Sequence, residues 1–389
     1  MFTLSLEKLK PLGAEITTAE IKQQPELWAE TFTLYNEKIE KIQAFLQNIT
    51  EKHGRVRVIF TGAGTSAYVG DTVTPYLKGK VDENQWDVQS VPTTAIVSNP
   101  YQLLKADIPT LLVSFARSGN SPESVATVEL AQQIVTNLYQ ITITCSKEGQ
   151  LAQRAAGDDE NLLLLMPEKS NDQGFAMTGS YTCMALTALL IFDTLSDEEK
   201  GQIVKTIRTM GDSVISREAE ISEKLAVDFE RIIYLGSGGF EGLAREAQLK
   251  ILELTAGKMA TAFDSSLGFR HGPKSFVNDK AVIFTFVSNQ PYTRRYDLDM
   301  LNELKQDQVA SLICAISVDG DSNYSGDTFL FDREAGTVPD AYLSLPFVMV
   351  GQTIALLASI KVGNTPDTPS PSGTVNRVVK GVTIHEYKN

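Results

Sequence analysis

The chain has 389 residues, a formal net charge of −13 and a pI of about 4.9; 42% of its residues are hydrophobic and 21% are charged. This length predicts about two to three domains with enough apolar residues for a sizeable core. The acidic balance argues against nucleic acid as a partner, because nucleic acid attracts a basic surface. It also argues against adhesion to anionic membranes.

No uninterrupted apolar run reaches the roughly 18 residues of a membrane-spanning helix, so we expect no membrane partner. The N-terminus lacks the charged-then-apolar order of a signal peptide. Cys145, Cys183 and Cys314 lie far apart in the sequence and form no CxxC motif. We therefore expect buried thiols in a cytoplasmic protein that holds no metal.

The first 50 residues are expected to be helical, because apolar side chains between residues 28 and 46 recur at helical spacing. From residue 55 on, short β-rich runs alternate with helical stretches, which predicts βαβ units and a parallel sheet. A first series of runs covers residues 56–61, 86–91, 110–115, 140–145 and 161–166. A second series covers residues 231–235, 259–263, 281–287 and 312–317.

The same strand–glycine–helix pattern occurs once in each series. Gly62-Ala63-Gly64 follows the first run of one series, and Gly236-Ser237-Gly238 follows the first run of the other. We interpret this as an internal duplication of one α/β domain. The predicted parts are a helical segment at 1–50, a first domain at 51–205 and a second domain at 206–389. A single large sheet is the alternative.

The first glycine turn continues into Thr65 and Ser66 at the start of a predicted helix. Backbone N–H groups of such a turn, together with the helix N-terminus, suit an anion. The full GxGxxG pattern does not follow, and no acidic residue marks a ribose site, so we expect no dinucleotide cofactor. A tight turn without a ligand is the alternative.

A second candidate loop follows the run at 110–115 and reads Arg117-Ser118-Gly119-Asn120-Ser121-Pro122. Hydroxyl groups, turn N–H groups and the arginine are the groups that surround a phosphate monoester. No lysine follows a glycine as in an NTPase loop. Both loops lie where open α/β sheets bind ligands, at strand ends. Ordinary N-cap chemistry of Ser121 before Pro122 is the alternative.

A predicted helix places Glu246, Lys250 and Glu253 on one face, because they are spaced at i, i+4 and i+7. The chain has only three histidines, and His271 follows this helix closely, in the turn Arg270-His271-Gly272-Pro273. Carboxylates, an ammonium and an imidazole are the groups that proton transfer on a sugar requires. The alternatives are exposed helix ion pairs and a structural histidine.

Together these segments resemble the sugar isomerase (SIS) domain family over about residues 50–389. The chain is similar to the isomerase half of glucosamine-6-phosphate synthase. It is also similar to the group of tagatose-6-phosphate ketose/aldose isomerases and galactosamine-6-phosphate deaminase/isomerases. The resemblance implies an α/β fold of two tandem SIS-type domains after an N-terminal helical segment, each domain a parallel sheet flanked by helices.

The resemblance also implies roles for individual residues. The catalytic residues that it implies are Glu246, Lys250, Glu253, His271 and, at the C-terminus, Lys380. The phosphate- and substrate-binding residues that it implies are Gly64, Thr65, Ser66, Arg117, Ser118, Asn120, Ser121, Ala176 and Thr178. Met177 departs from the family pattern, since it replaces a hydroxyl-bearing residue. The second domain lacks a serine-rich loop like that at 118–121, so we expect phosphate binding in the first domain and one composite site per chain.

The expected function is deamination and isomerisation of an amino-sugar 6-phosphate by enediol or enolamine proton transfer. The galactose series is implied: galactosamine 6-phosphate would give tagatose 6-phosphate and ammonia. An aldose–ketose isomerase without deamination and a non-catalytic sugar-phosphate sensor are the alternatives. The only expected partners are the small sugar phosphate and further copies of the chain, in a homodimer or larger homo-oligomer with sites near its subunit interfaces.

Overall fold

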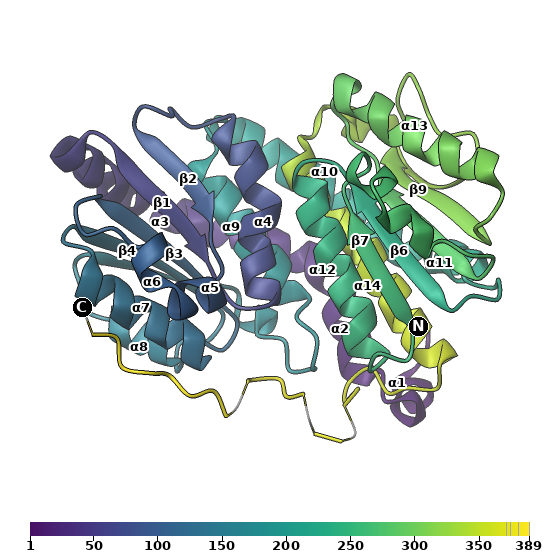
Figure 1. Cartoon of the computed structure of the whole chain (residues 1–389), viewed down its shortest axis with the longest axis horizontal. Coiled ribbons are helices and arrows are strands. Elements are labelled where there is room, and N and C mark those ends of the chain that lie inside the picture. The colour runs from purple at the N-terminus through teal and green to yellow at the C-terminus, as the bar shows by residue number, and fades with distance from the viewer. Residues whose placement is uncertain (371, 374, 380, 389) are drawn as a thin grey trace. The chain divides into compact units, whose positions relative to one another are not determined.

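The computed structural model describes residues 1–370, 372–373, 375–379 and 381–388. They form two compact units, each built around one parallel five-stranded sheet (Figure 1). The β1–β5 unit contains Leu27–Asp172, Gly179–Asp197 and the described residues from 375 on. The β6–β10 unit contains Met1–Glu26, Gln173–Thr178 and the described residues of Glu198–Gly373. The N-terminal 50 residues are helical as expected, but the two units share them.

In the β1–β5 unit the strand order is β2-β1-β3-β4-β5. The strands are β1 (Val56–Thr61), β2 (Trp86–Ser90), β3 (Thr110–Ala116), β4 (Leu138–Thr144) and β5 (Asn161–Leu165). The helices are α3 (Gln24–His53), α4 (Thr65–Lys78), α5 (Thr93–Ser98), α6 (Pro100–Leu103), α7 (Pro122–Ile134), α8 (Gln150–Ala155), η2 (Glu168–Ser170) and α9 (Gly179–Phe192). Strand β3 is buried along its whole length, as expected where helices cover both faces of a parallel sheet.

In the β6–β10 unit the order is β10-β9-β8-β6-β7, which is the same order when β6 is matched to β1. The strands are β6 (Arg231–Gly236), β7 (Ala260–Asp264), β8 (Ala281–Phe286), β9 (Leu312–Val318) and β10 (Asp327–Phe331). The longer helices are α2 (Glu15–Lys22), α10 (Asp197–Ser216), α11 (Glu218–Lys224), α12 (Gly239–Leu254), α13 (Pro291–Asp307) and α14 (Asp340–Lys361). The short ones are α1 (Leu6–Leu9), η1 (Lys10–Leu12), η3 (Gly268–Arg270), η4 (Pro273–Phe276) and η5 (Arg333–Thr337).

The two glycine turns confirm the predicted duplication in detail. Gly64 has φ 57° and ψ −129°, and Gly238 has φ 61° and ψ −125°; each caps the helix that follows. The glycine that ends the preceding strand is equally constrained in both turns. A Cβ atom on Gly62 or on Gly236 would lie 2.6 Å from atoms of the residue four positions later. The same close approach of strand and helix is therefore used twice.

Two sequence expectations need correction. The alternative of one large sheet is wrong, because the strands form two separate sheets. Strand β10 (Asp327–Phe331) was not expected, since its short run alternates between buried and exposed positions. It is one of the two edge strands of its sheet and pairs with β9 alone.

Helix α14 is long and apolar enough, by length and composition alone, to cross a membrane. In the structure, however, 89% of its most apolar 18-residue window is buried inside the protein. Its apolar sequence is explained by this burial, because a helix covered on all sides needs no polar face.

We expect Gly238→Ala to lower the free energy of unfolding by about 1–3 kcal/mol, because its backbone conformation is strained for a residue with a side chain. Nothing described lies within 4 Å of the added Cβ, so the loss would come from the backbone alone. Urea denaturation measures the effect. Gly79→Ala is the control, since Gly79 has φ −81°. Equal stability of the two variants would contradict the conformational explanation.

Candidate functional site

The two candidate phosphate loops begin side by side at the carboxyl ends of two neighbouring strands of the β1–β5 sheet. Strands β1 and β3 are neighbours, and Thr61 pairs with Ser114 near their carboxyl ends. The connections from these two strands lead to opposite sides of the sheet, because β2 lies beyond β1 and β4 lies beyond β3. Open α/β sheets bind ligands at such a switch point. The structure therefore brings the loops at 62–66 and 117–121 together there.

The first loop leads directly into helix α4. Thr65 and Ser66 are its first residues and are 3% and 5% exposed, whereas Gly64 is exposed. The Ser66 N–H donates to the Ala63 carbonyl at 3.2 Å and the Ala67 N–H to the Gly64 carbonyl at 2.9 Å, so the loop is a tight turn that starts the helix. The positive end of the helix dipole at this N-terminus favours an anion.

The second loop leads into helix α7, with Ser121 at the N-cap and Pro122 at the first position. The Ser121 side chain makes no cap hydrogen bond, so plain N-cap chemistry does not account for it. Ser118 and Ser121 are both partly exposed. The amide oxygen of Asn120 accepts a hydrogen bond from the Gln150 N–H at 3.0 Å, which attaches the loop to helix α8. Of the two polar atoms of the Asn120 side chain, only the amide nitrogen can donate a hydrogen bond to an anion.

Arg117 is 6% exposed, and its guanidinium donates to the Arg377 carbonyl at 2.7 Å. Arg377 itself donates to the Asp172 carbonyl at 2.9 Å and to the Asn171 side-chain oxygen at 3.2 Å. Burial raises the pKa of the nearby Cys145 thiol to about 12, although both guanidinium groups act to lower it. Arg377 therefore brings a second positive charge near the Arg117 loop. Sequence reasoning missed it, because no motif surrounds it.

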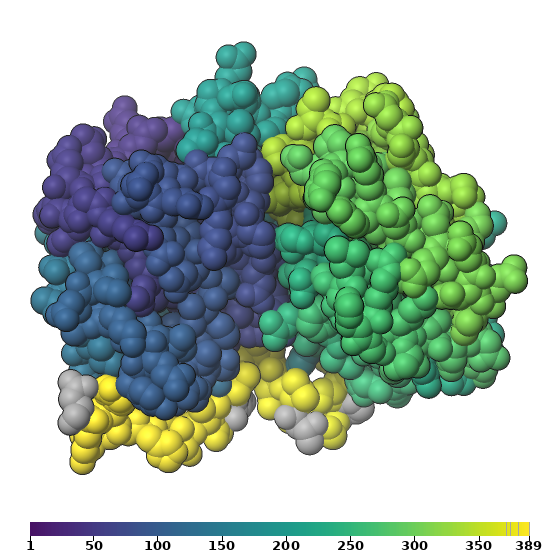
Figure 2. All heavy atoms as spheres, turned by 45° about the horizontal axis from the view of Figure 1, so that its top comes forward, coloured from purple at the N-terminus to yellow at the C-terminus, as the bar shows by residue number. Residues whose placement is uncertain are grey.

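The C-terminal tail that carries Arg377 lies along the β1–β5 unit. In Figure 2 its yellow atoms contact the blue atoms of this unit at the lower left. The Gln133 side chain of helix α7 donates to the Tyr387 carbonyl at 3.1 Å, which attaches the end of the tail. Lys380, the expected catalytic lysine of this tail, lies outside the described residues.

The remaining predicted substrate contacts lie in Gln173–Thr178, which belongs to the β6–β10 unit. Ala176 and Thr178 are both 1% exposed. The Gly174 N–H donates to the Glu20 carboxylate at 3.2 Å, so helix α2 holds the segment in place. Sequence reasoning did not assign this role to Glu20.

The predicted proton-transfer residues form a buried array on helix α12. The Lys250 ammonium lies 3.3 Å from a Glu246 carboxylate oxygen and 2.6 Å from one of Glu253. The side chains of Glu246 and Lys250 are 0% exposed, whereas that of Glu253 is 20% exposed. The alternative of exposed helix ion pairs is therefore wrong for Glu246 and Lys250. The array is closed at one end and opens to solvent at Glu253.

The charge of Lys250 is maintained by its two partners. Burial alone would lower its pKa, but the attraction of Glu246 and Glu253 outweighs burial and leaves the pKa above its ordinary value. Lys250 is thus a protonated donor at neutral pH. Its positive charge stabilises the negative charge of the two neighbouring carboxylates.

His271 lies in an exposed turn between η3 and η4 of the same unit. Within the described residues it has no hydrogen bond or ion pair to another side chain. Gly272 follows it with φ 123°, a conformation that glycine permits. The other histidines lie in the β1–β5 unit: His53 contacts the Tyr139 hydroxyl at 2.8 Å, and His385 is exposed on the tail.

At the carboxyl ends of the β6–β10 strands, the polar groups bond to a carboxylate of the chain itself. The buried Asp297 carboxylate accepts hydrogen bonds from the Ser237 hydroxyl at 2.5 Å, the Ser266 hydroxyl at 2.6 Å and the Ser288 N–H at 2.9 Å. Burial raises the pKa of Asp297, against these hydrogen bonds, which lower it. The donors that follow β6, β7 and β8 are therefore occupied by the chain's own carboxylate.

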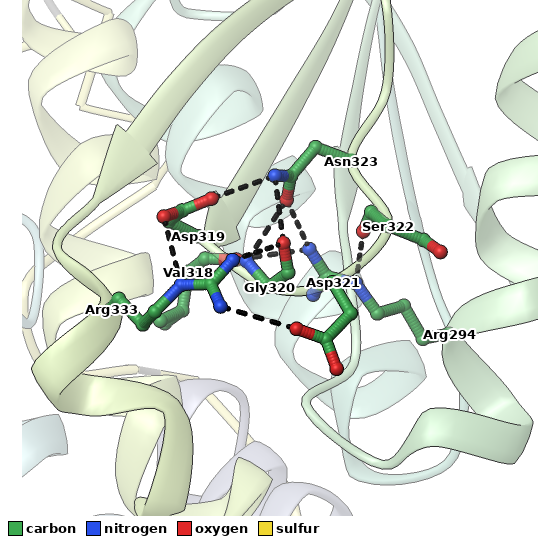
Figure 3. Close-up of polar contacts among 8 residues, drawn as sticks. All are labelled: Arg294, Val318, Asp319, Gly320, Asp321, Ser322, Asn323 and Arg333. Atoms are coloured by element: carbon green, nitrogen blue, oxygen red, sulfur yellow. Dashed lines mark hydrogen bonds and ion pairs between the residues drawn. The ribbon is translucent and has the colours of Figure 1, made fainter.

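Arg294 of helix α13 supports this edge by hydrogen bonds to main-chain oxygens and to the Asn323 side-chain oxygen. Its guanidinium donates to the Val318 carbonyl at 2.9 Å and to the Ser322 carbonyl at 2.7 Å (Figure 3). Arg333 binds the same connection between β9 and β10 through Asp319 and Asp321 (Figure 3). No group of three or more His, Cys, Asp or Glu side chains that could hold a metal ion occurs in the described part of the chain.

We expect Lys250→Met to lower the free energy of unfolding by about 3–5 kcal/mol, because it leaves the Glu246 carboxylate buried without its cation. The double variant Glu246→Gln/Lys250→Met should recover much of this loss in urea denaturation. Lys280→Met is the control, because its ion pair with Glu230 is exposed and screened by solvent, so its loss should leave stability nearly unchanged. A Lys250→Met variant as stable as this control would contradict the buried array.

Comparison with known proteins places this geometry in a family. The SIS domain model matches residues 51–192, which include all five strands of the β1–β5 sheet. The D-galactosamine-6-phosphate deaminase AgaS of Escherichia coli is 43% identical over 374 residues, which are 96% of each chain.

Solved structures agree with this assignment. The crystal structure of tagatose-6-phosphate ketose/aldose isomerase from Escherichia coli matches with a TM-score of 0.84 at 40% identity, over 96% of this chain and 97% of the other. The C-terminal domain of glucosamine-fructose-6-phosphate aminotransferase from Francisella tularensis has a TM-score of 0.72 at 17% identity, over 90% and 98% of the chains, and so shares the fold. On this evidence, the chain belongs to the SIS domain family.

Proposed function

We propose that this protein deaminates and isomerises an amino-sugar 6-phosphate, with galactosamine 6-phosphate as substrate and tagatose 6-phosphate and ammonia as products. The coarser assignment follows from its relatives: it is an enzyme of the sugar-phosphate isomerase and deaminase class. The buried array on helix α12, whose one partly exposed carboxylate belongs to Glu253, is the observation that supports proton transfer. The choice of deamination rests on the likeness to the D-galactosamine-6-phosphate deaminase AgaS.

The proposed reaction begins with ring opening, in which His271 takes the proton of the anomeric hydroxyl and returns one to the ring oxygen. Glu253 then removes the proton from C2 of the open aldehyde, and O1 takes up a proton from solvent, which gives a neutral enolamine. The same carboxyl group delivers its proton to C1, which gives a hydroxyl group at C1 and a protonated imine at C2. Water adds to this imine carbon, and ammonia leaves with the C–N bond electrons.

Lys250 has a supporting role in this scheme. Its ammonium holds the Glu253 carboxylate by a hydrogen bond of 2.6 Å, and Glu246 keeps that ammonium charged on the opposite side. The carboxylate is thereby oriented before substrate binds. Pre-organised orientation of this kind lowers the barrier to proton transfer.

The phosphate would be bound at the switch point of the β1–β5 unit. The hydroxyls of Ser118 and Ser121 and the Arg117 guanidinium are suitable donors to its oxygens, and the positive end of helix α4 favours its charge. Arg377 adds positive charge nearby. In the β6–β10 unit, Asp297 occupies the corresponding donors, which supports a single phosphate site per chain.

The alternative is an aldose–ketose isomerase without deamination, which uses the same proton transfer on a 2-hydroxy sugar. One solved relative is named as such an isomerase. The residues on helix α12 do not distinguish an amino group from a hydroxyl group at C2. We favour deamination because of the curated AgaS relatives. We also propose that the protein works as a homo-oligomer, in which the exposed His271 contributes to a site near a subunit interface.

The purified protein should release ammonia from galactosamine 6-phosphate, and Glu253→Gln should lower kcat by about 100- to 10,000-fold, because it removes the proposed base. Coupled detection of ammonia and of ketose phosphate measures both products. Glu230→Gln, a change at an exposed ion pair, is the matched control and should retain activity. Interconversion of tagatose and galactose 6-phosphates without ammonia would overturn deamination. A fully active Glu253→Gln variant would overturn the assignment of the base.

Ser118→Ala and Ser121→Ala should each weaken binding of galactose 6-phosphate by about 10-fold or more, since a hydrogen bond to a charged group contributes about 1.5–3 kcal/mol. Titration calorimetry measures the affinity, with unphosphorylated galactose as the reference ligand. Ser98→Ala is the control, because its exposed hydroxyl bonds only locally, to the Thr94 and Ala95 carbonyls and to the side-chain amide of Asn99. Unchanged affinity in both loop variants would contradict this phosphate site.

A further inference from the structure

The turn that carries His271 is attached to helix α13 by charged residues on both of its sides. Arg270 directly precedes the histidine, and its side chain contacts the Glu303 carboxylate at 2.6 Å. Lys274 follows it by three positions and contacts the other oxygen of the same carboxylate. Lys274 also contacts Asp307, one helical turn further along α13, at 2.6 Å. A single carboxylate therefore links the two ends of the histidine turn.

The base of this turn is held separately, by the apolar core. Phe269 is 0% exposed and belongs to one buried cluster with Met300 and Leu304 of helix α13. This packing anchors the base of the turn to helix α13. It does not orient the exposed His271, whose backbone neighbour Gly272 has an unusual conformation and no side chain to restrict it.

The charges of this contact are present at neutral pH. Hydrogen bonds from Lys274 and Arg270 hold the pKa of Glu303 below its ordinary value. A carboxylate with a lowered pKa stabilises the fold above its unfolded pKa, and this contribution is lost as the pH falls through the folded pKa. The contact should therefore open only in acid.

We propose that Glu303 is a positioning residue for His271, holding the imidazole where it opens the sugar ring. This inference rests on the proposed function, in which His271 is the ring opener. Glu303 touches no reacting atom and acts through the turn. A small displacement of a catalytic group costs much more in rate than in stability, so the two effects can be separated.

The test isolates ring opening from the later steps. In the Glu253→Gln background the proton transfer at C2 is blocked, but the enzyme should still accelerate the exchange between the α and β anomers of galactosamine 6-phosphate. NMR exchange spectroscopy measures this exchange. Adding Glu303→Gln should slow the enzyme-dependent exchange by about ten- to a hundred-fold. The affinity for the sugar phosphate should stay unchanged.

The matched control is Glu230→Gln in the same background. It also removes one carboxylate charge from an ion pair, here with Lys280 at 2.7 Å, in the same unit. The two variants should have melting temperatures within about 4 °C of each other. Only Glu303→Gln should slow the anomer exchange.

The outcomes separate the inference from the function on which it rests. If Glu303→Gln and Glu230→Gln leave the exchange equally fast, Glu303 does not position His271, although the proposed function stands. If the Glu253→Gln enzyme binds the sugar phosphate but does not accelerate the exchange at all, ring opening by this protein is refuted. Loss of exchange together with general unfolding of the Glu303→Gln variant would show a structural role and overturn the positioning role.

Discussion

The β6–β10 unit depends on one electrostatic constraint, the complete burial of Lys250 within helix α12. A buried ammonium is tolerated only beside carboxylates that offset its lost hydration. Glu246 provides one such partner inside the unit, and Glu253 provides the other at the margin of solvent. The largely buried helix α14 packs against α12 and excludes water from this side. Structural stability and the proposed proton transfer thus depend on the same three side chains.

The two halves of the chain share one fold but differ in the polar groups at the carboxyl ends of their strands. Strand order and the conformations of Gly64 and Gly238 are shared, because both are needed to bring the first helix close to its strand. At the switch point the halves differ. In the β1–β5 unit, the loop at 117–121 carries the partly exposed hydroxyls of Ser118 and Ser121. In the β6–β10 unit, the corresponding hydroxyl and N–H donors bond to the Asp297 carboxylate. Divergence at this edge leaves the packing of the sheet intact.

Several features were predictable from sequence because they depend on neighbours along the chain. The helical spacing of Glu246, Lys250 and Glu253 set their common face, and the alternation of strands and helices predicted parallel sheets. Strand β10 was not predictable, since a short edge strand has a weak pattern. Arg377 and Glu303 were also missed, because each meets its partners through contacts between segments distant in sequence.

The sequence by itself determined the fold class, the duplication, the two candidate loops and the composition of the helix proposed to transfer protons. Each is encoded in residues within a few turns of one another. The tertiary structure alone decided which charges are buried, which serines are already occupied and what holds the histidine turn. Burial and long-range contacts arise only when distant segments pack. A lysine like Lys250 would be ordinary on an exposed helix, but packing under α14 makes it a buried charge at the centre of the candidate site.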